Sequence, residues 1–119
     1  MAKRRFPQAV YSHGTEPDPR FSLANERTFL AWIRTSLALV AAGVALEALD
    51  LPIQEDLRFT SAILFVVLGL IAAANAWVGW AITEVSLRRS RALPTPTLSI
   101  VLSVGVILAT ALIGVGLFL

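Results

Sequence analysis

The sequence predicts an all-α integral membrane protein with three transmembrane helices, a basic amphipathic extension before the first, and assembly into a homo-oligomer. Hydrophobic residues make up 56% of the 119 residues and charged residues 15%, too little polar surface for a soluble domain. Three apolar runs, over residues 28–49, 59–82 and 98–119, can each cross a bilayer, for which about 20 residues suffice. We therefore expect a flexible, proline-containing cytoplasmic tail over residues 1–18 and a three-helix membrane domain over residues 19–119.

The first helix is predicted to begin before the bilayer. Asp18 followed by Pro19 is typical of an N-cap residue and a proline at the first helical position, and neither proline nor glycine follows before Gly43. A helix over residues 19–49 would be about 46 Å long at 1.5 Å per residue, whereas the hydrocarbon core is about 30 Å thick. The part before Phe29 must therefore project into the cytoplasm or bend along the headgroups.

Arginines enter this helix on one face. Arg20, Arg27 and Arg34 recur every seven residues, or two helical turns, and alanines continue the same face into the bilayer: Ala31, Ala38, Ala41 and Ala45. An arginine at mid-bilayer costs roughly 2.5 to 3.5 kcal/mol on an insertion scale, so it needs a partner or a function. We expect this face to look at protein or water, and the bulky faces to look at lipid or at neighbouring helices.

The other two spans are rich in small residues. Gly69, Ala73 and Ala76 form a stripe on the second span that favours close helix packing, and Asn75 within the same span is expected to make an interhelical hydrogen bond. The third span carries serines, a threonine and glycines but no ionisable side chain. Three such helices bury little of their surface area within one chain, which favours oligomerisation.

The charges predict the orientation in the membrane. Nine of the ten Lys and Arg residues precede residue 35 or lie in the connection over residues 83–97, whereas the connection over residues 50–58 holds only Arg58. By the positive-inside rule the amino terminus and the 83–97 connection are cytoplasmic, and the 50–58 connection and the carboxyl terminus face outward. We therefore predict a multi-pass protein of the inner (cytoplasmic) membrane, with the lipid bilayer as its first partner.

Enzyme chemistry is not predicted. The chain has no cysteine, its one histidine lies in the tail, and it contains no phosphate-binding loop and no nucleophile motif. We expect no catalytic residues, no cofactor, no metal site and no nucleic acid partner. The acidic residues around the outward connection could in principle bind a cation, but an acidic outer loop is what the topology rule alone predicts: Glu47, Asp50, Glu55 and Asp56.

The arginines allow two interpretations each. Arg88, Arg89 and Arg91 are typical of a topology anchor on anionic lipid headgroups. Arg27 and Arg34 can snorkel to the headgroups along their aliphatic stems. In the functional alternative they face an oligomer axis as rings of positive charge, which attract and pass anions or phosphate groups. The guanidinium fork suits this use because it bonds phosphate oxygens bidentately.

The run RFSLANERTFLAWIRTS, over residues 20–36, closely resembles the YidH-like family of small bacterial membrane proteins, which carry a domain of unknown function. Its NERTFLxW core is also similar to that of the small membrane subunit of the eukaryotic vacuolar transporter chaperone, which makes and translocates polyphosphate. The resemblance implies helices assembled around a basic path. It implies pore-lining roles for Arg20 and Arg27, an ion-pair role for Glu26 with a neighbouring subunit, and a basic cluster at Arg88 and Arg89.

The chain also departs from the chaperone subunit. A basic residue expected shortly before the third span falls on Leu93, and the polymerase domains are absent, which excludes polyphosphate synthesis. Two function hypotheses follow. The first is an oligomeric, channel-like assembly with a basic cytoplasmic vestibule for phosphate or polyphosphate. The second is a structural or accessory subunit whose small-residue face packs against a partner membrane protein.

Overall fold

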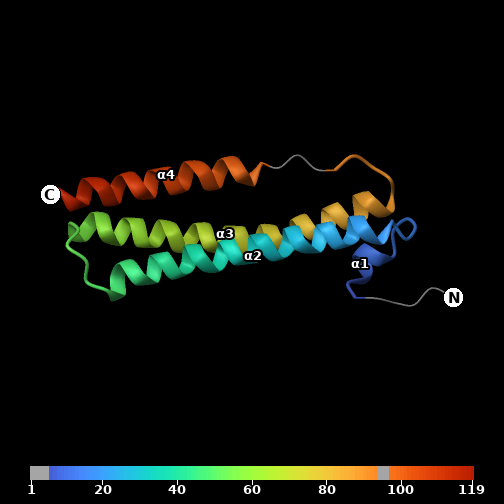
Figure 1. Ribbon diagram of the computed structural model, residues 1–119, viewed down its shortest axis with the longest axis horizontal. Helices are drawn as coiled ribbons and strands as arrows, with labels where there is room; N and C mark the ends of the chain where they lie inside the picture. Colours follow the sequence, from blue (N-terminus) through green and yellow to red (C-terminus); the bar gives the residue numbers. More distant parts are fainter. Residues whose placement is uncertain (1–5, 94–96) are drawn as a thin grey trace.

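The computed structural model describes residues 6–93 and 97–119, which form an elongated bundle 65 Å long and 24 by 20 Å across (Figure 1). A short helix precedes three long ones in the order α1 (Gln8–Tyr11), α2 (Pro19–Ala48), α3 (Glu55–Arg88) and α4 (Leu98–Leu117). The three long helices are long and apolar enough to cross a membrane, which confirms the predicted all-α membrane fold. Part of the predicted cytoplasmic charge lies outside the described residues: Lys3, Arg4 and Arg5.

The helix α2 begins where the sequence predicts. The Asp18 side chain accepts a hydrogen bond of 2.9 Å from the backbone N–H of Arg20, and Pro19 occupies the first turn. The Arg20 guanidinium, and after it this N–H, hold the pKa of the Asp18 carboxyl below its ordinary value. The ionised carboxylate is the form that caps the helix, so its contribution is complete at neutral pH and is lost as the pH falls through the lowered pKa.

The helix α3 is longer than the apolar run that predicts it. It begins at Glu55, where the Gln54 side chain accepts a hydrogen bond of 2.9 Å from the backbone N–H of Leu57, and it ends at Arg88. Acidic residues in the first turn and a basic residue in the last turn complement the helix dipole. Its 34 residues span about 51 Å at 1.5 Å per residue, so α3, like α2, extends beyond a hydrocarbon core of about 30 Å.

The helix α3 lies between α2 and α4 and contacts both, whereas the backbones of α2 and α4 stay apart in the described part of the chain (Figure 1). Two glycines bring α2 and α3 close together. A Cβ atom on Gly43 would lie 2.6 Å from the carbonyl oxygen of Ala62, and one on Gly69 would lie 2.9 Å from that of Ser36. The Ser36 hydroxyl in turn donates a hydrogen bond of 2.7 Å to the Gly69 carbonyl. Small residues thus allow backbone contact where no hydrophobic effect draws helices together.

The small-residue stripe predicted on the second span is used within the chain. Gly69 and Ala76 are buried and Ala73 is half-buried. Asn75 was expected to bond another helix. Its side chain instead lines a groove and makes no hydrogen bond to any residue that the structure describes.

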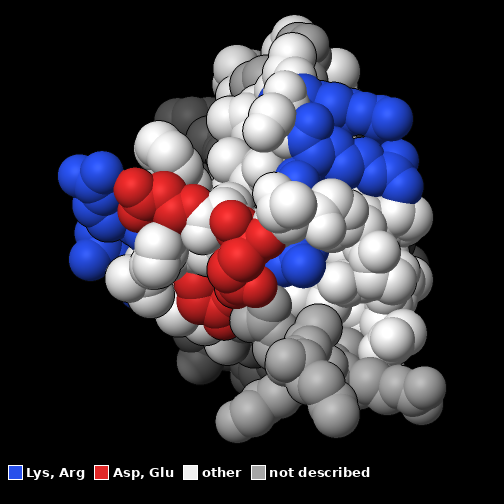
Figure 2. All heavy atoms as spheres, turned by 90° about the vertical axis from the view of Figure 1, so that its right-hand side faces the viewer, with Lys and Arg blue, Asp and Glu red and all other residues white. Residues whose placement is uncertain are grey.

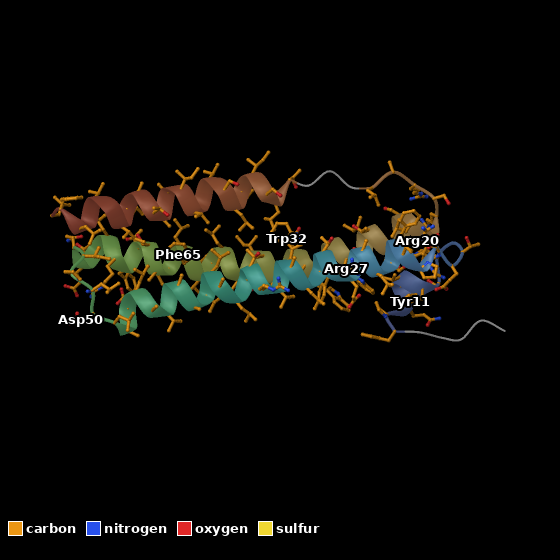
Figure 3. All side chains as sticks on the ribbon, viewed as in Figure 1. Tyr11, Arg20, Arg27, Trp32, Asp50 and Phe65 are labelled. Atoms are coloured by element: carbon orange, nitrogen blue, oxygen red, sulfur yellow. The ribbon has the colours of Figure 1, made fainter. Side chains whose placement is uncertain are left out.

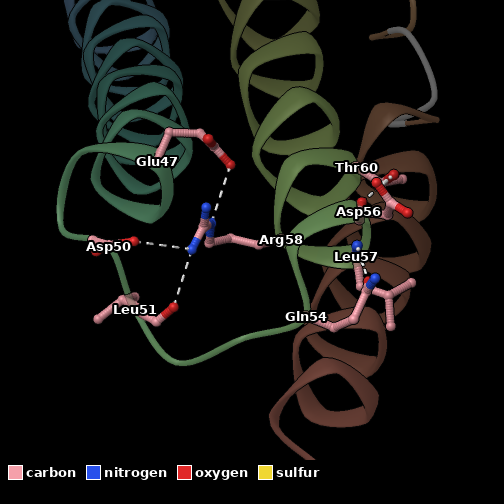
Figure 4. Close-up of polar contacts among 8 residues, drawn as sticks. All are labelled: Glu47, Asp50, Leu51, Gln54, Asp56, Leu57, Arg58 and Thr60. Carbon is pink, nitrogen blue, oxygen red and sulfur yellow. Dashed lines mark hydrogen bonds and ion pairs between the residues drawn. The ribbon is translucent and has the colours of Figure 1, made fainter. Parts of the chain in front are cut away.

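The connection between α2 and α3 is folded around Arg58 (Figure 4). Its guanidinium lies 3.5 Å from carboxylate oxygens of Glu47 and Asp50 and donates a hydrogen bond of 3.1 Å to the carbonyl of Leu51. The one basic residue of an acidic loop therefore ties the end of α2 to the start of α3.

Residues 6–18 differ from the flexible tail that we expected. The helix α1 packs against the end of α3, with Val10 only 3% exposed. The backbone N–H of Thr15 donates a hydrogen bond of 2.9 Å to the Arg88 carbonyl, and Gly14 has a positive φ of 55° directly above that carbonyl. The last carbonyls of a helix need external donors, and this segment supplies one. Tail composition gives no sign of this because the partner lies more than 70 residues away along the chain.

Candidate functional site

The predicted arginine stripe lies on the outer face of α2. Arg20, Arg27 and Arg34 are all exposed, and Arg20 and Arg27 follow one another along the first turns of the helix (Figure 3). The alanines that continue this face toward the middle of α2 are also exposed: Ala31, Ala38 and Ala41. The opposite face, with Asn25, Ser36, Leu39 and Gly43, is buried. The structure therefore leaves the stripe uncovered by the chain's own described residues.

The members of the stripe differ in their partners. Arg20 forms an ion pair of 2.9 Å with Asp18 at the exposed helix start. Arg27 and Arg34 make no hydrogen bond or ion pair with any residue in the described ranges. Glu26, the predicted ion-pair residue, is likewise exposed and has no cationic partner among those residues. Two cations of the stripe and the exposed Glu26 beside it thus have no partner among the residues that the structure describes.

Arg88 has a different place from the one predicted. Its side chain is 7% exposed and holds the amino-terminal segment to α3. The guanidinium donates hydrogen bonds of 2.7 Å to the His13 carbonyl and 3.1 Å to the Tyr11 carbonyl, and it lies 3.3 Å from a Glu16 carboxylate oxygen. It also sits 5.4 Å from the centre of the Tyr11 ring. These contacts occupy Arg88 within the chain, whereas Arg89 is exposed and its guanidinium meets the His13 ring.

The charged side chains at this end are not evenly spread. Viewed along the long axis, from the end at which α2 begins and α3 finishes, Lys and Arg gather in separate patches with acidic side chains between them (Figure 2). Lys and Arg at this end of the molecule therefore do not form one continuous basic surface.

A buried polar cluster joins α2 and α3 at the same end. Glu84 is 3% exposed and accepts hydrogen bonds of 2.5 Å from the Ser22 hydroxyl and 3.5 Å from the Asn25 amide. The Asn25 amide also donates one of 3.1 Å to the Trp80 carbonyl. Glu84 is not among the site residues predicted from the sequence. The sequence feature that could have identified this residue is a carboxylate one helical turn before Arg88, in a helix that continues past the apolar run.

A groove of about 550 Å³ lies between the first half of α2, the last half of α3 and the start of α4. Its walls carry aromatic and aliphatic side chains together with a few uncharged polar ones. The lining includes Ala24, Asn75, Gly79, Thr83, Leu87 and Leu93. In the described residues no three His, Cys, Asp or Glu side chains lie close enough together to hold a metal ion.

Comparisons with known proteins place these features in a family context. Residues 20–86 match the family described as "Domain of unknown function (DUF202)". The chain is 38% identical over 107 residues to the inner membrane protein YidH of Escherichia coli, covering 89% of this chain and 92% of that protein. It is 45% identical over 84 residues to an uncharacterized protein of Mycobacterium tuberculosis, covering 66% of each. No solved structure matches the chain significantly.

Proposed function

Because the chain belongs to the DUF202 family, whose function is unknown, and is like YidH a multi-pass inner membrane protein, we propose that it assembles into a homo-oligomer that conducts anions such as phosphate or polyphosphate. In this assembly the α2 helices surround a shared axis, and Arg20, Arg27 and Arg34 form a basic vestibule at the cytoplasmic end. The proposed activity is conduction, without catalysis and without a cofactor.

The observation that carries the proposal is the exposure of Arg27 and Arg34 without partners within the described chain. Arg34 lies five residues beyond Phe29, or about 7.5 Å deeper at 1.5 Å per residue. On an isolated chain this guanidinium must snorkel to the headgroups or lie in hydrocarbon, where an arginine costs up to roughly 2.5 to 3.5 kcal/mol at the bilayer centre. Facing a hydrated axis removes that cost, and phosphate oxygens match the geometry of the guanidinium donors.

The deeper part of the same face supports close approach of several chains. Ala31, Ala38 and Ala41 are exposed in the single chain although small residues are what helix interfaces in membranes prefer. Large apolar side chains elsewhere on the surface suit lipid contact, for example Leu37, Ile107 and Val115. The stripe is therefore the face of α2 best suited to meet its copies.

The accessory-subunit hypothesis has less support. It assigned the partner contact to Gly69, Ala73 and Ala76. Gly69 and Ala76 are buried, and Gly69 packs against Ser36 and Val40 of α2. No exposed face of small residues is left on that side of α3 for a partner to occupy.

The proposed orientation has a direct test, because the chain has no cysteine. Single cysteines are introduced at Pro52 and at Ala92, both exposed and at opposite ends of the molecule. We expect a membrane-impermeant maleimide to label Pro52→Cys in intact spheroplasts, and to label Ala92→Cys only after permeabilisation. The reverse pattern would place the arginine stripe on the outer side and remove the cytoplasmic vestibule.

The conduction proposal predicts a charge-dependent flux. In liposomes loaded with phosphate, replacing both Arg27 and Arg34 by Gln is expected to lower efflux at least tenfold. A charge-assisted hydrogen bond is worth about 1.5 to 3 kcal/mol, and about 1.4 kcal/mol is a factor of ten. The matched control is the Arg27→Lys/Arg34→Lys pair, which keeps the charge and is expected to retain most of the flux. Equal efflux from the Gln pair and the wild type would overturn the proposal.

Assembly is measured separately from flux. A cysteine at Ala38, on the stripe, is expected to form disulfide cross-links between chains, whereas one at Ile107, 69% exposed on α4, is not. The cross-linking of Ala38→Cys should be the same with Arg or Gln at positions 27 and 34. Absence of the Ala38 cross-link would contradict the shared axis.

A further inference from the structure

The groove described above follows the direction of the helices through about half a bilayer. On α3 its lining runs from Asn75 to Leu87, twelve residues or about 18 Å at 1.5 Å per residue, against about 15 Å for half of a hydrocarbon core. It exists because α4 begins only at Leu98 and leaves the last part of α3 uncovered. Gly79 lies in its wall, and a Cβ atom there would meet only the Asn75 side chain, at 3.8 Å.

The width of the groove indicates the kind of occupant. Dividing 550 Å³ by the length of about 18 Å gives a mean cross-section of roughly 30 Å². This cross-section accommodates a single extended hydrocarbon chain.

The end of the groove away from the bilayer centre is basic. Leu87 and Leu93 both line it, and the turn between them carries Arg89 and Arg91. This turn folds back on α3, because the Arg91 backbone N–H donates a hydrogen bond of 2.8 Å to the Ser86 carbonyl. The Arg91 side chain is exposed and makes no hydrogen bond or ion pair with any described residue. Basic side chains are visible over this end of the molecule (Figure 2).

We propose that this groove binds an anionic phospholipid, with one acyl chain along Gly79 and the phosphate at Arg91 and Arg89. The lining nearest the basic end includes the uncharged Thr83, whose hydroxyl can donate a hydrogen bond to an ester oxygen of such a lipid. The carboxylate of Glu84 does not line the groove; it lies behind Asn25, a lining residue, and accepts hydrogen bonds from Ser22 and Asn25. On α2 this site adjoins the arginine stripe, because Ala24 lies one helical turn from both Arg20 and Arg27. Its charges come from the turn after α3, so the proposal does not rest on conduction.

The test measures lipid retained by the purified full-length protein. Protein in mild detergent is exposed to equal amounts of phosphatidylglycerol and phosphatidylcholine, and bound lipid is counted by native mass spectrometry. We expect the wild type to retain phosphatidylglycerol in preference. Arg91→Gln should lower that preference about fivefold, the effect of one basic residue at an anionic lipid surface.

Variants that fill the groove separate the acyl-chain contact from the charge. Gly79→Leu is expected to lower retention of both lipids at least fivefold. The matched control is Gly114→Leu on α4, where nothing lies within 4 Å of a Cβ atom, and it should retain lipid like the wild type. Ala24→Leu fills the opposite wall and repeats the test if Gly79→Leu does not fold. Equal retention in the filled and control variants, equal retention of the two lipids by the wild type, or no retained lipid would overturn the proposal.

Discussion

Gly43→Ala is expected to lower the free energy of unfolding by about 1 to 3 kcal/mol, the usual cost of forcing an extra methyl group into a packed interface. The new Cβ would lie 2.6 Å from the Ala62 carbonyl oxygen and 2.7 Å from a Val66 methyl group. Backbone of α3 cannot yield as a flexible side chain can, so α2 and α3 must separate. The chain's three tryptophans report unfolding in mixed micelles of a mild detergent and dodecyl sulfate.

Gly114→Ala is the control for this measurement. No described residue packs within 4 Å of a Cβ atom at Gly114, which is also helical. Alanine is favoured over glycine in a helix by about 0.5 to 1 kcal/mol, so this variant is expected to be slightly more stable than the wild type. If both variants shift stability in the same direction, the close approach of α2 and α3 at Gly43 is not what limits packing.

Arg88→Leu is expected to release residues 8–16 from the end of α3. The substitution removes two charged hydrogen bonds to the Tyr11 and His13 carbonyls and the contact with Glu16. Hydrogen bonds to charged groups are each worth about 1.5 to 3 kcal/mol. Glu16 is 64% exposed, so its ion pair adds little. A loss of about 3 kcal/mol corresponds to amide hydrogen exchange in this segment that is about a hundredfold faster.

Arg88→Lys separates the effect of the planar set of guanidinium donors from the effect of the positive charge. Lysine keeps the positive charge but cannot reach two carbonyls and a carboxylate with the same planar geometry. We expect intermediate exchange rates for residues 8–16 and unchanged protection in α2 and the first half of α3. Wild-type protection of the segment in Arg88→Leu would show that it docks through contacts that do not need the Arg88 side chain, such as Val10 and the backbone hydrogen bond from Thr15 to the Arg88 carbonyl.

The parts of the fold that local patterns determine were predictable. The start of α2 followed from Asp18 and Pro19, since a capping carboxylate and a first-turn proline act within a few residues. The membrane spans followed from apolar length. The true ends of α3 did not, because Glu55 and Arg88 extend the helix into water, where hydropathy gives no signal and capping and charge decide.

The candidate site was predictable in part for the same reason. The common face of Arg20, Arg27 and Arg34 depends only on helical periodicity, and the structure places all three on one exposed face. The role of Arg88 depends on contacts more than 70 residues away in sequence, and the Glu84 cluster depends on the register between α2 and α3. Neither can be read from one segment at a time.

The central position of α3 has a consequence for what one chain can do alone. Only 22% of the apolar window of α2 and 17% of that of α4 are buried within the chain. The interior of a single subunit is therefore too narrow to shield a hydrated solute from hydrocarbon. Any polar route must be a property of the quaternary structure, so dilution into monomers would abolish it while leaving every helix folded.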